Sequence, residues 1–119
     1  MTGLTIILTG PDETRLRAAI SLACAAAALG GRARVHFHEH AVALLVGGRE
    51  GDADERLASG LPDRHTLFAH AREGGVELSA CQTGMALQRI DHSALTHDIE
   101  ATGLVGLLAG LGDDRLVML

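Results

Sequence analysis

The sequence predicts a single three-layer α/β/α domain built on a parallel sheet of four to five strands. Three observations favour this class. Apolar runs of strand length alternate with helical segments along all 119 residues. The first two predicted strands flank a long helix, as in a βαβ unit, so they should be parallel. Hydrophobic residues make up 47% of the chain, which suits a buried core rather than disorder.

The first half of the chain begins with the β-rich run LTIIL at residues 4–8, which ends at a Thr-Gly-Pro turn. The helix expected over residues 12–29 opens with acidic residues and ends at a Gly-Gly pair. Its Ala-rich body is apolar nearly all round, which predicts burial on more than one side, within the layers or against another subunit. The second strand is expected at residues 32–37 (RARVHF), and the apolar segment 41–46 predicts one or two helical turns.

Further elements are expected after a loop. Residues 47–60 are rich in Gly and charge, which predicts an exposed loop. A helix at residues 62–72 ends at a second Gly-Gly pair, and the short strand VELSA follows at residues 76–80. A turn then leads to a short helix at residues 85–89.

The last part of the chain is expected to close the sheet. A polar stretch at residues 91–100 has room for one turn of helix. Thr102 is expected to cap a helix over residues 103–111 that ends at Gly112, and RLVML at residues 115–119 is the final strand. Ligands of such sheets bind at the carboxyl ends of the strands, so the residues that follow each strand are candidates for chemistry.

Composition and charge exclude several classes of function. The chain has two Phe as its only aromatic residues, and its net charge is −5. Without aromatic platforms or a basic stripe, we expect no nucleic-acid partner. The absence of Lys excludes Schiff-base chemistry and a P-loop lysine. No signal peptide is recognisable and the longest apolar run is too short to cross a bilayer, so we expect a cytoplasmic protein with no membrane partner.

Cys81 is the strongest candidate for chemistry. It follows a predicted strand and precedes a predicted helix, where backbone N–H groups stabilise a thiolate. Its neighbours Gln82, Thr83 and Gly84 are small or polar, which favours access and makes them candidates to line the site. Most free cysteines are buried structural residues, so a structural Cys81 remains the alternative. Cys24 lies in the Ala-rich helix and is expected to be a small core residue.

Three alternating histidines, His36, His38 and His40, have a spacing that is found among metal ligands. The strand is expected to end near His38, which breaks the register, and no Cys accompanies the run in sequence. We therefore expect no metal and no cofactor, and a metal-binding or ligand-binding regulator is only a third hypothesis. His38 and His40 are expected to line the site at the edge of the sheet, together with Thr9 and Gly10 after the first strand.

Several segments follow one another in a recognisable order: LTIILTG, a long Ala-rich helix ending at Leu29-Gly30, RVHFHEHAVALL, a helix ending in REGGVE, LSACQTGMAL, and a closing helix with the strand RLVML. This order resembles the DsrE/DsrF-like family of small sulfur-relay proteins. The resemblance covers nearly the whole chain, and the cysteine segment contributes most to it. It implies a DsrEF-like α/β fold and one DsrE-like domain over residues 1–119.

The resemblance also implies a function. In this family a cysteine at the place of Cys81 can carry a persulfide, which implies a sulfurtransferase-type carrier that relays sulfane sulfur through Cys81 and needs no cofactor. No second cysteine lies near Cys81 in sequence, so its sulfur donor and acceptor would be other proteins. The alternative is a non-catalytic oligomeric accessory module of the same fold in which Cys81 is structural, and whether the chain is an enzyme stays open.

The resemblance further implies oligomers, often trimers or hexamers. The Ala-rich face of residues 15–29 and the apolar segment 41–46 offer more apolar surface than a small sheet can cover. We therefore expect a homo-oligomer, either a trimer or a hexamer built from trimers.

Overall fold

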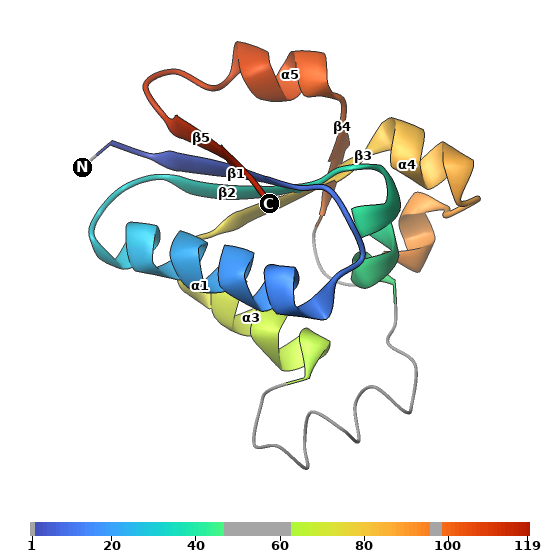
Figure 1. The fold of residues 1–119 in the computed structure, drawn as a ribbon, viewed down its shortest axis with the longest axis horizontal. Coiled ribbons are helices and arrows are strands. Elements are labelled where there is room, and N and C mark those ends of the chain that lie inside the picture. Colours follow the sequence, from blue (N-terminus) through green and yellow to red (C-terminus); the bar gives the residue numbers. More distant parts are fainter. Residues whose placement is uncertain (1, 47–62, 96–98) are drawn as a thin grey trace.

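The computed structural model describes residues 2–46, 63–95 and 99–119. Within these ranges, one all-parallel sheet has the strand order β4-β3-β2-β1-β5 (Figure 1). Helices cover both faces of the sheet, with α1 and α3 on one side and α5 on the other (Figure 1). The predicted three-layer α/β/α class is therefore confirmed.

The described elements have the following bounds. The strands are β1 (Leu4–Leu8), β2 (Ala33–Phe37), β3 (Glu77–Cys81), β4 (Glu100–Thr102) and β5 (Arg115–Met118). The helices are α1 (Glu13–Ala28), α3 (Arg64–Glu73), α4 (Gln82–Leu87) and α5 (Leu104–Ala109), with 3₁₀ helices η1 (Glu39–Leu45) and η2 (His92–Ala94). None of the described helices is both long and apolar enough to span a membrane. The loop expected at residues 47–60 lies outside the described residues.

The long predicted helix is confirmed as α1. The carboxylate of Asp12 caps it by accepting a hydrogen bond from the Arg15 backbone N–H at 2.9 Å, and Gly30 follows it with a positive φ of 91°. The expectation that α1 is buried on more than one side is not met within this chain. Its buried positions, Leu16, Ala19, Ile20, Ala23 and Ala26, follow helical spacing and form one face that packs on β1 and β2.

The core between the sheet and this helical layer holds β2 in place. Phe37, the last residue of β2, is fully buried and packs edge-on against Phe68 of α3, with ring centroids 5.9 Å apart. The buried side chains of Phe68 and Ala71 hold α3 against the sheet. This packing determines where the chain leaves β2, and therefore where the histidines after it lie.

The face of the sheet that α5 covers has a polar network near the amino ends of the strands. The Asp114 carboxylate accepts hydrogen bonds from Arg32 at 2.7 Å and from the Thr5 hydroxyl at 2.8 Å. Arg34 donates to Thr5 at 3.0 Å and to the Leu107 carbonyl of α5 at 3.3 Å. Burial alone would raise the pKa of Asp114, but the hydrogen bonds from Arg32 and Thr5 outweigh it and lower that pKa. The network ties β1, β2 and α5 to the turn before β5.

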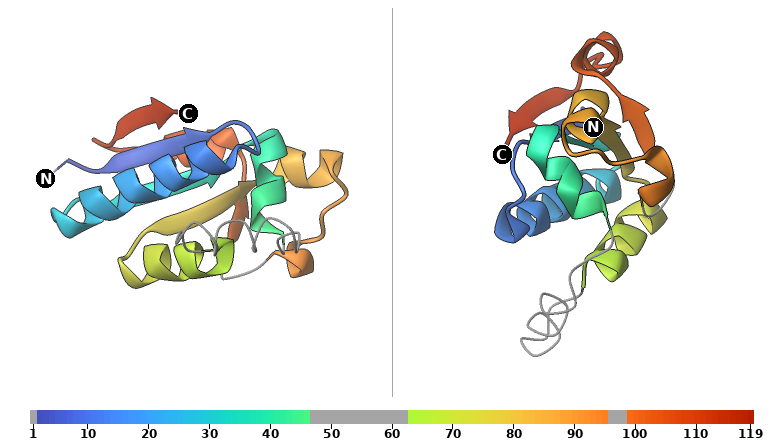
Figure 2. Two further views of the ribbon diagram at one scale, coloured as in Figure 1. Left: turned by 60° about the horizontal axis from the view of Figure 1, so that its bottom comes forward. Right: turned by 90° about the vertical axis from the view of Figure 1, so that its right-hand side faces the viewer.

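One strand was not predicted. Thr102, the expected helix cap, is instead the last residue of β4, and Gly103 is the residue that precedes α5. The three residues of β4 have no apolar alternation, and they form a strand because they pair with Ser79–Cys81 at the edge of the sheet. The helices α4 and η1 lie side by side beyond the carboxyl ends of β2 and β3 (Figure 2).

Two predicted features near β3 need correction. Residues 81–84 do not form a separate turn before a helix at 85–89, because β3 extends through Cys81 and α4 begins directly at Gln82. The segment 41–46 does form helical turns, as η1, but Ala41, Val42, Leu44 and Leu45 are buried inside the chain. That segment is therefore not available as a surface for another subunit.

Candidate functional site

The register between β2 and β3 brings two histidines to Cys81. His36 pairs with Ser79 across the two strands, and Phe37 pairs with Ala80. His38 keeps an extended backbone, with φ −94° and ψ 132°, so the alternation of side chains continues one residue beyond the strand. His36 and His38 therefore project to the same side of the sheet as Cys81.

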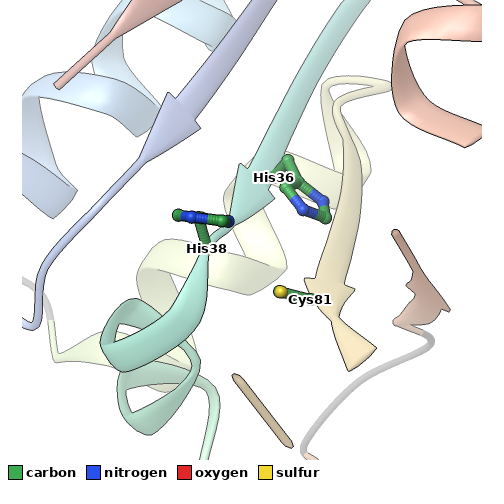
Figure 3. Close-up of side chains that lie close together, drawn as sticks. All are labelled: His36, His38 and Cys81. Carbon is green, nitrogen blue, oxygen red and sulfur yellow. The ribbon is translucent and has the colours of Figure 1, made fainter. Parts of the chain in front are cut away.

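Cys81 is both the last residue of β3 and the N-cap of α4. Its sulfur accepts a hydrogen bond from the Gly84 backbone N–H, with a nitrogen-to-sulfur distance of 3.4 Å. The residue is only 3% exposed. One ring nitrogen from each of His36 and His38 and the Cys81 sulfur all lie within 4.8 Å of one another (Figure 3).

The two histidines differ in surroundings. His36 is fully buried, and burial, with the charges of His38 and Arg34, lowers its pKa from 6.5 to about 4, so it is neutral at pH 7. Its Nδ1 lies 2.8 Å from the Ser79 hydroxyl, while its Nε2 is buried without a hydrogen-bond partner. The Nδ1 of His38 is also buried without a partner, and its Nε2 lies 3.7 Å from a carboxylate oxygen of Glu39. Each histidine thus has one unpaired nitrogen.

A cavity of about 470 Å³ leads to this cluster. It is lined by His38, Glu39, Cys81, Gln82, Thr83, Gly103, Leu104, Val105 and Gly106. The candidates His38, Gln82 and Thr83 thus border the same space as Cys81. Gly103 and the first turn of α5 also line this space, and none of these residues is among the predicted site residues.

Close backbone packing fixes the position of Cys81 relative to His38. A Cβ at Gly84 would lie 2.5 Å from the backbone oxygen of Glu39, so only glycine permits α4 to approach η1 this closely. The side-chain amide of Gln88 donates a hydrogen bond of 2.8 Å to the same oxygen. Glu39 has a left-handed backbone with φ 47°, a conformation that costs a non-glycine residue free energy. Gly84, predicted to line the site, is not among the residues that line the cavity, but its backbone N–H contacts the Cys81 sulfur.

Three predicted site residues lie apart from the cavity. Thr9 donates through both its backbone N–H and its hydroxyl to the Leu119 carbonyl, each at 2.9 Å, and neither it nor Gly10 is among the lining residues. His40 is exposed on η1 and is not part of the cluster. The expected break in the histidine register is confirmed, because β2 ends at Phe37 and the chain turns into η1. His36, which is not one of the predicted site residues, belongs to the cluster instead.

Comparison with known proteins supports the architecture. No protein-family model matches the sequence, and no curated protein matches it. The YchN protein from E. coli matches over 100% of both chains with a TM-score of 0.73 and 18% identity. MTH1491 from Methanobacterium thermoautotrophicum, described as a protein of unknown function, matches over 100% of both chains with a TM-score of 0.65 and 16% identity.

Both of these structures have the DsrE/DsrF-like fold. The chain has a DsrE/DsrF-like fold. At such low identity the likeness establishes the arrangement of helices and strands, which agrees with the fold that the resemblance implied. What the chain does must be argued from its own residues around Cys81.

Proposed function

We propose that this chain is a persulfide-relay protein that carries sulfane sulfur on Cys81. The observation that carries the proposal is the position of the Cys81 sulfur, which lies beside two histidines with unpaired nitrogens and borders a cavity of about 470 Å³. A thiol next to a proton acceptor is the arrangement that activates a cysteine nucleophile. The DsrE/DsrF-like fold supports the proposal at the level of architecture.

The first step is deprotonation of Cys81. His38 is the proton acceptor, because its unpaired Nδ1 is available and His36, with a pKa of about 4, is a poor base. The Gly84 N–H, which already contacts the sulfur, stabilises the resulting thiolate. The product is a thiolate next to an imidazolium.

Sulfur loading then proceeds without a cofactor. The Cys81 thiolate attacks the outer sulfur of a donor persulfide, a new S–S bond forms, and the donor S–S bond breaks. The donor leaves as a thiolate and takes the proton from His38. Unloading follows the same course, as an acceptor thiolate attacks the terminal sulfur and regenerates the Cys81 thiolate. No net oxidation or reduction occurs in either transfer.

The donor and the acceptor are other proteins in this proposal. Cys24 is the second thiol of the chain, and it lies on α1, which covers the opposite face of the sheet from α5 (Figure 1). Arg34, which alternates with His36 along β2, contacts α5, so the Cys81 cluster projects toward the α5 side. A thiol on α1 cannot reach the Cys81 sulfur through the sheet.

Exposure alone would not favour Cys81 in a labelling experiment. Cys24, expected to be a small core residue, packs against the core but is partly exposed, whereas Cys81 is buried. Partial burial raises the pKa of the Cys24 thiol. The two thiols must therefore be separated by mutation rather than by their accessibility to a reagent.

The test is the intact mass of the protein after incubation with polysulfide in the presence of a chelator. Wild type and Cys24→Ser should gain about 32 Da per sulfur atom, and Cys81→Ser should not show this gain. Serine is a favourable N-cap, so Cys81→Ser should stay folded in a thermal melt. If Cys24→Ser gains no mass, or if Cys81→Ser gains as much mass as Cys24→Ser does, the relay proposal is wrong.

The burial of Cys81 favours one alternative. Its side chain packs with the hydrophobic core cluster, as a structural cysteine would. In that case the chain is a non-catalytic accessory module of the same fold. Cys81→Ser would then lower stability without any difference in sulfur loading between the cysteine variants.

We also propose that the chain forms a homo-oligomer, a trimer or a hexamer. Large apolar side chains are exposed on α5 and β5, including Val105 at 85% and Met118 at 63%, with Leu108 and Leu116 about half exposed. Light scattering at micromolar concentration should therefore give a multiple of the 12.4 kDa chain mass. Val105→Glu should shift the mass toward a single chain, and a wild-type protein that measures as a monomer would contradict this prediction.

A further inference from the structure

We infer that His36, His38 and Cys81 form a binding site for a divalent transition-metal ion, with Zn²⁺ the best match to the donor set. Two imidazole nitrogens and one sulfur all lie within 4.8 Å of one another (Figure 3). Such nitrogen and sulfur donors suit Zn²⁺ and exclude Mg²⁺ and Ca²⁺, which bind oxygen. This inference goes beyond the sulfur relay and does not depend on it.

The separations are close to those of a coordinated ion. Zinc binds histidine nitrogen at about 2.0–2.1 Å and thiolate sulfur at about 2.3 Å in tetrahedral geometry. Those bond lengths place neighbouring donors roughly 3.3–3.6 Å apart. Side-chain rotations that move each donor by less than about 1 Å would therefore complete the site.

Each of the two histidines has one ring nitrogen that is free to bind a metal ion. The buried Nε2 of His36 and the buried Nδ1 of His38 have no hydrogen-bond partners. The other ring nitrogen of His36 lies 2.8 Å from the Ser79 hydroxyl, so Nδ1–H can donate there and leave Nε2 as the ligand. On His38 the remaining nitrogen faces the Glu39 carboxylate at 3.7 Å. Metal-bound histidines are commonly oriented by an outer hydroxyl or carboxylate of this kind.

The fourth coordination position would face the cavity. His38 and Cys81 line this space of about 470 Å³, whereas His36 is fully buried behind them. Three protein ligands with one open position allow a water molecule or a small ligand to complete the coordination. The site therefore differs from a closed structural zinc site with four protein ligands.

The proposed ligands are not the three histidines of the alternating run, because Cys81 takes the place of His40. A metal site in the histidine run was not expected, because the strand register fails after His38 and no cysteine accompanies the run. The register does fail, and His40 is exposed outside the cluster. The missing third ligand is Cys81, which the pairing of β2 with β3 brings alongside His38.

Cobalt(II) titration of the untagged, full-length chain tests the inference, because tetrahedral Co²⁺ bound to a thiolate has a characteristic charge-transfer absorption. We expect this spectrum at one ion per chain and its loss when Zn²⁺ is added. His38→Gln and Cys81→Ser should each weaken binding by more than about 100-fold. His40→Gln and Cys24→Ser are matched controls, one from the same histidine run and one removing the other thiol, and should bind as wild type does.

Two outcomes would overturn the site. One is a Co²⁺ spectrum without the thiolate band. The other is a loss of Co²⁺ affinity in His40→Gln or Cys24→Ser that is as large as the loss in His38→Gln and Cys81→Ser. Circular dichroism of His38→Gln and Cys81→Ser separates ligand loss from unfolding, and His38 is preferred to the fully buried His36 for this reason. The titration uses no polysulfide and the sulfur-loading assay contains a chelator, so each proposal can fail without the other. If both hold, Zn²⁺ should inhibit sulfur loading by occupying the Cys81 thiolate.

Discussion

Gly84→Ala is expected to lower the free energy of unfolding by about 1–3 kcal/mol and to reduce sulfur loading at Cys81. The added Cβ would lie 2.5 Å from the backbone oxygen and 2.7 Å from the Cα of Glu39, distances that real Cβ atoms essentially never show. Because both atoms are backbone, η1 or α4 must shift. Helix propensity alone would favour alanine by about 1 kcal/mol, so the predicted sign is opposite to the local preference.

The same shift should disturb the Cys81 site. It moves the Gly84 N–H that contacts the Cys81 sulfur, and it moves Glu39, which follows His38 and also lines the cavity. Gly103→Ala is the matched control, since it lines the same cavity, has a negative φ of −107°, and would place its Cβ 4.0 Å from the nearest atom, on the Gln82 side chain. Urea denaturation and intact-mass loading of both variants measure the effect. Equal stability and loading for Gly84→Ala and wild type would contradict the packing argument.

The metal-free protein is expected to lose roughly 3 kcal/mol of stability as the pH falls from 6.5 to 4. Burial, together with the charges of His38 and Arg34, lowers the pKa of His36 from 6.5 to about 4 in the folded state. Between these values the unfolded chain binds a proton at His36 and the folded chain does not. The contribution of His36 is therefore fully present above pH 6.5 and is lost as the pH falls toward 4.

Urea denaturation at a series of pH values, with a chelator present, measures this dependence. His36→Gln removes the titrating group and should flatten the profile between pH 6.5 and 4. His40→Gln, in which an exposed histidine of the same run is replaced, should keep the wild-type slope. A His36→Gln profile as steep as that of wild type would show that other groups cause the acid instability.

Much of the fold could be predicted from local patterns. The apolar runs of β1 and β2 and the Gly-bounded Ala-rich helix are strong signals because each is visible within a single segment. β4 could not be found this way, since its three residues form a strand only through pairing with β3. The burial of η1 also depends on its contact with α4, which lies about forty residues further along the chain.

The site was also predictable only where a single segment of the sequence shows the feature. Cys81 followed from the rule that chemistry gathers at the carboxyl ends of parallel strands. The rule also selected Thr9 and Gly10, but β2 lies between β1 and β3, so these residues are a strand further away, beside Leu119. The role of His36 requires the strand order and the pairing of His36 with Ser79, neither of which can be read from one segment.

In the proposed relay, Cys81 both accepts sulfur and releases it. The direct measurement is an intact-mass time course on Cys24→Ser protein, in which Cys81 is the only thiol. Polysulfide is added, the excess is removed, and a small thiol then serves as the acceptor. A sulfur relay on Cys81 should give a gain of about 32 Da that disappears when the thiol is added, because the Cys81 persulfide transfers its outer sulfur. An unchanged mass after polysulfide, or an adduct that the thiol does not remove, would contradict it.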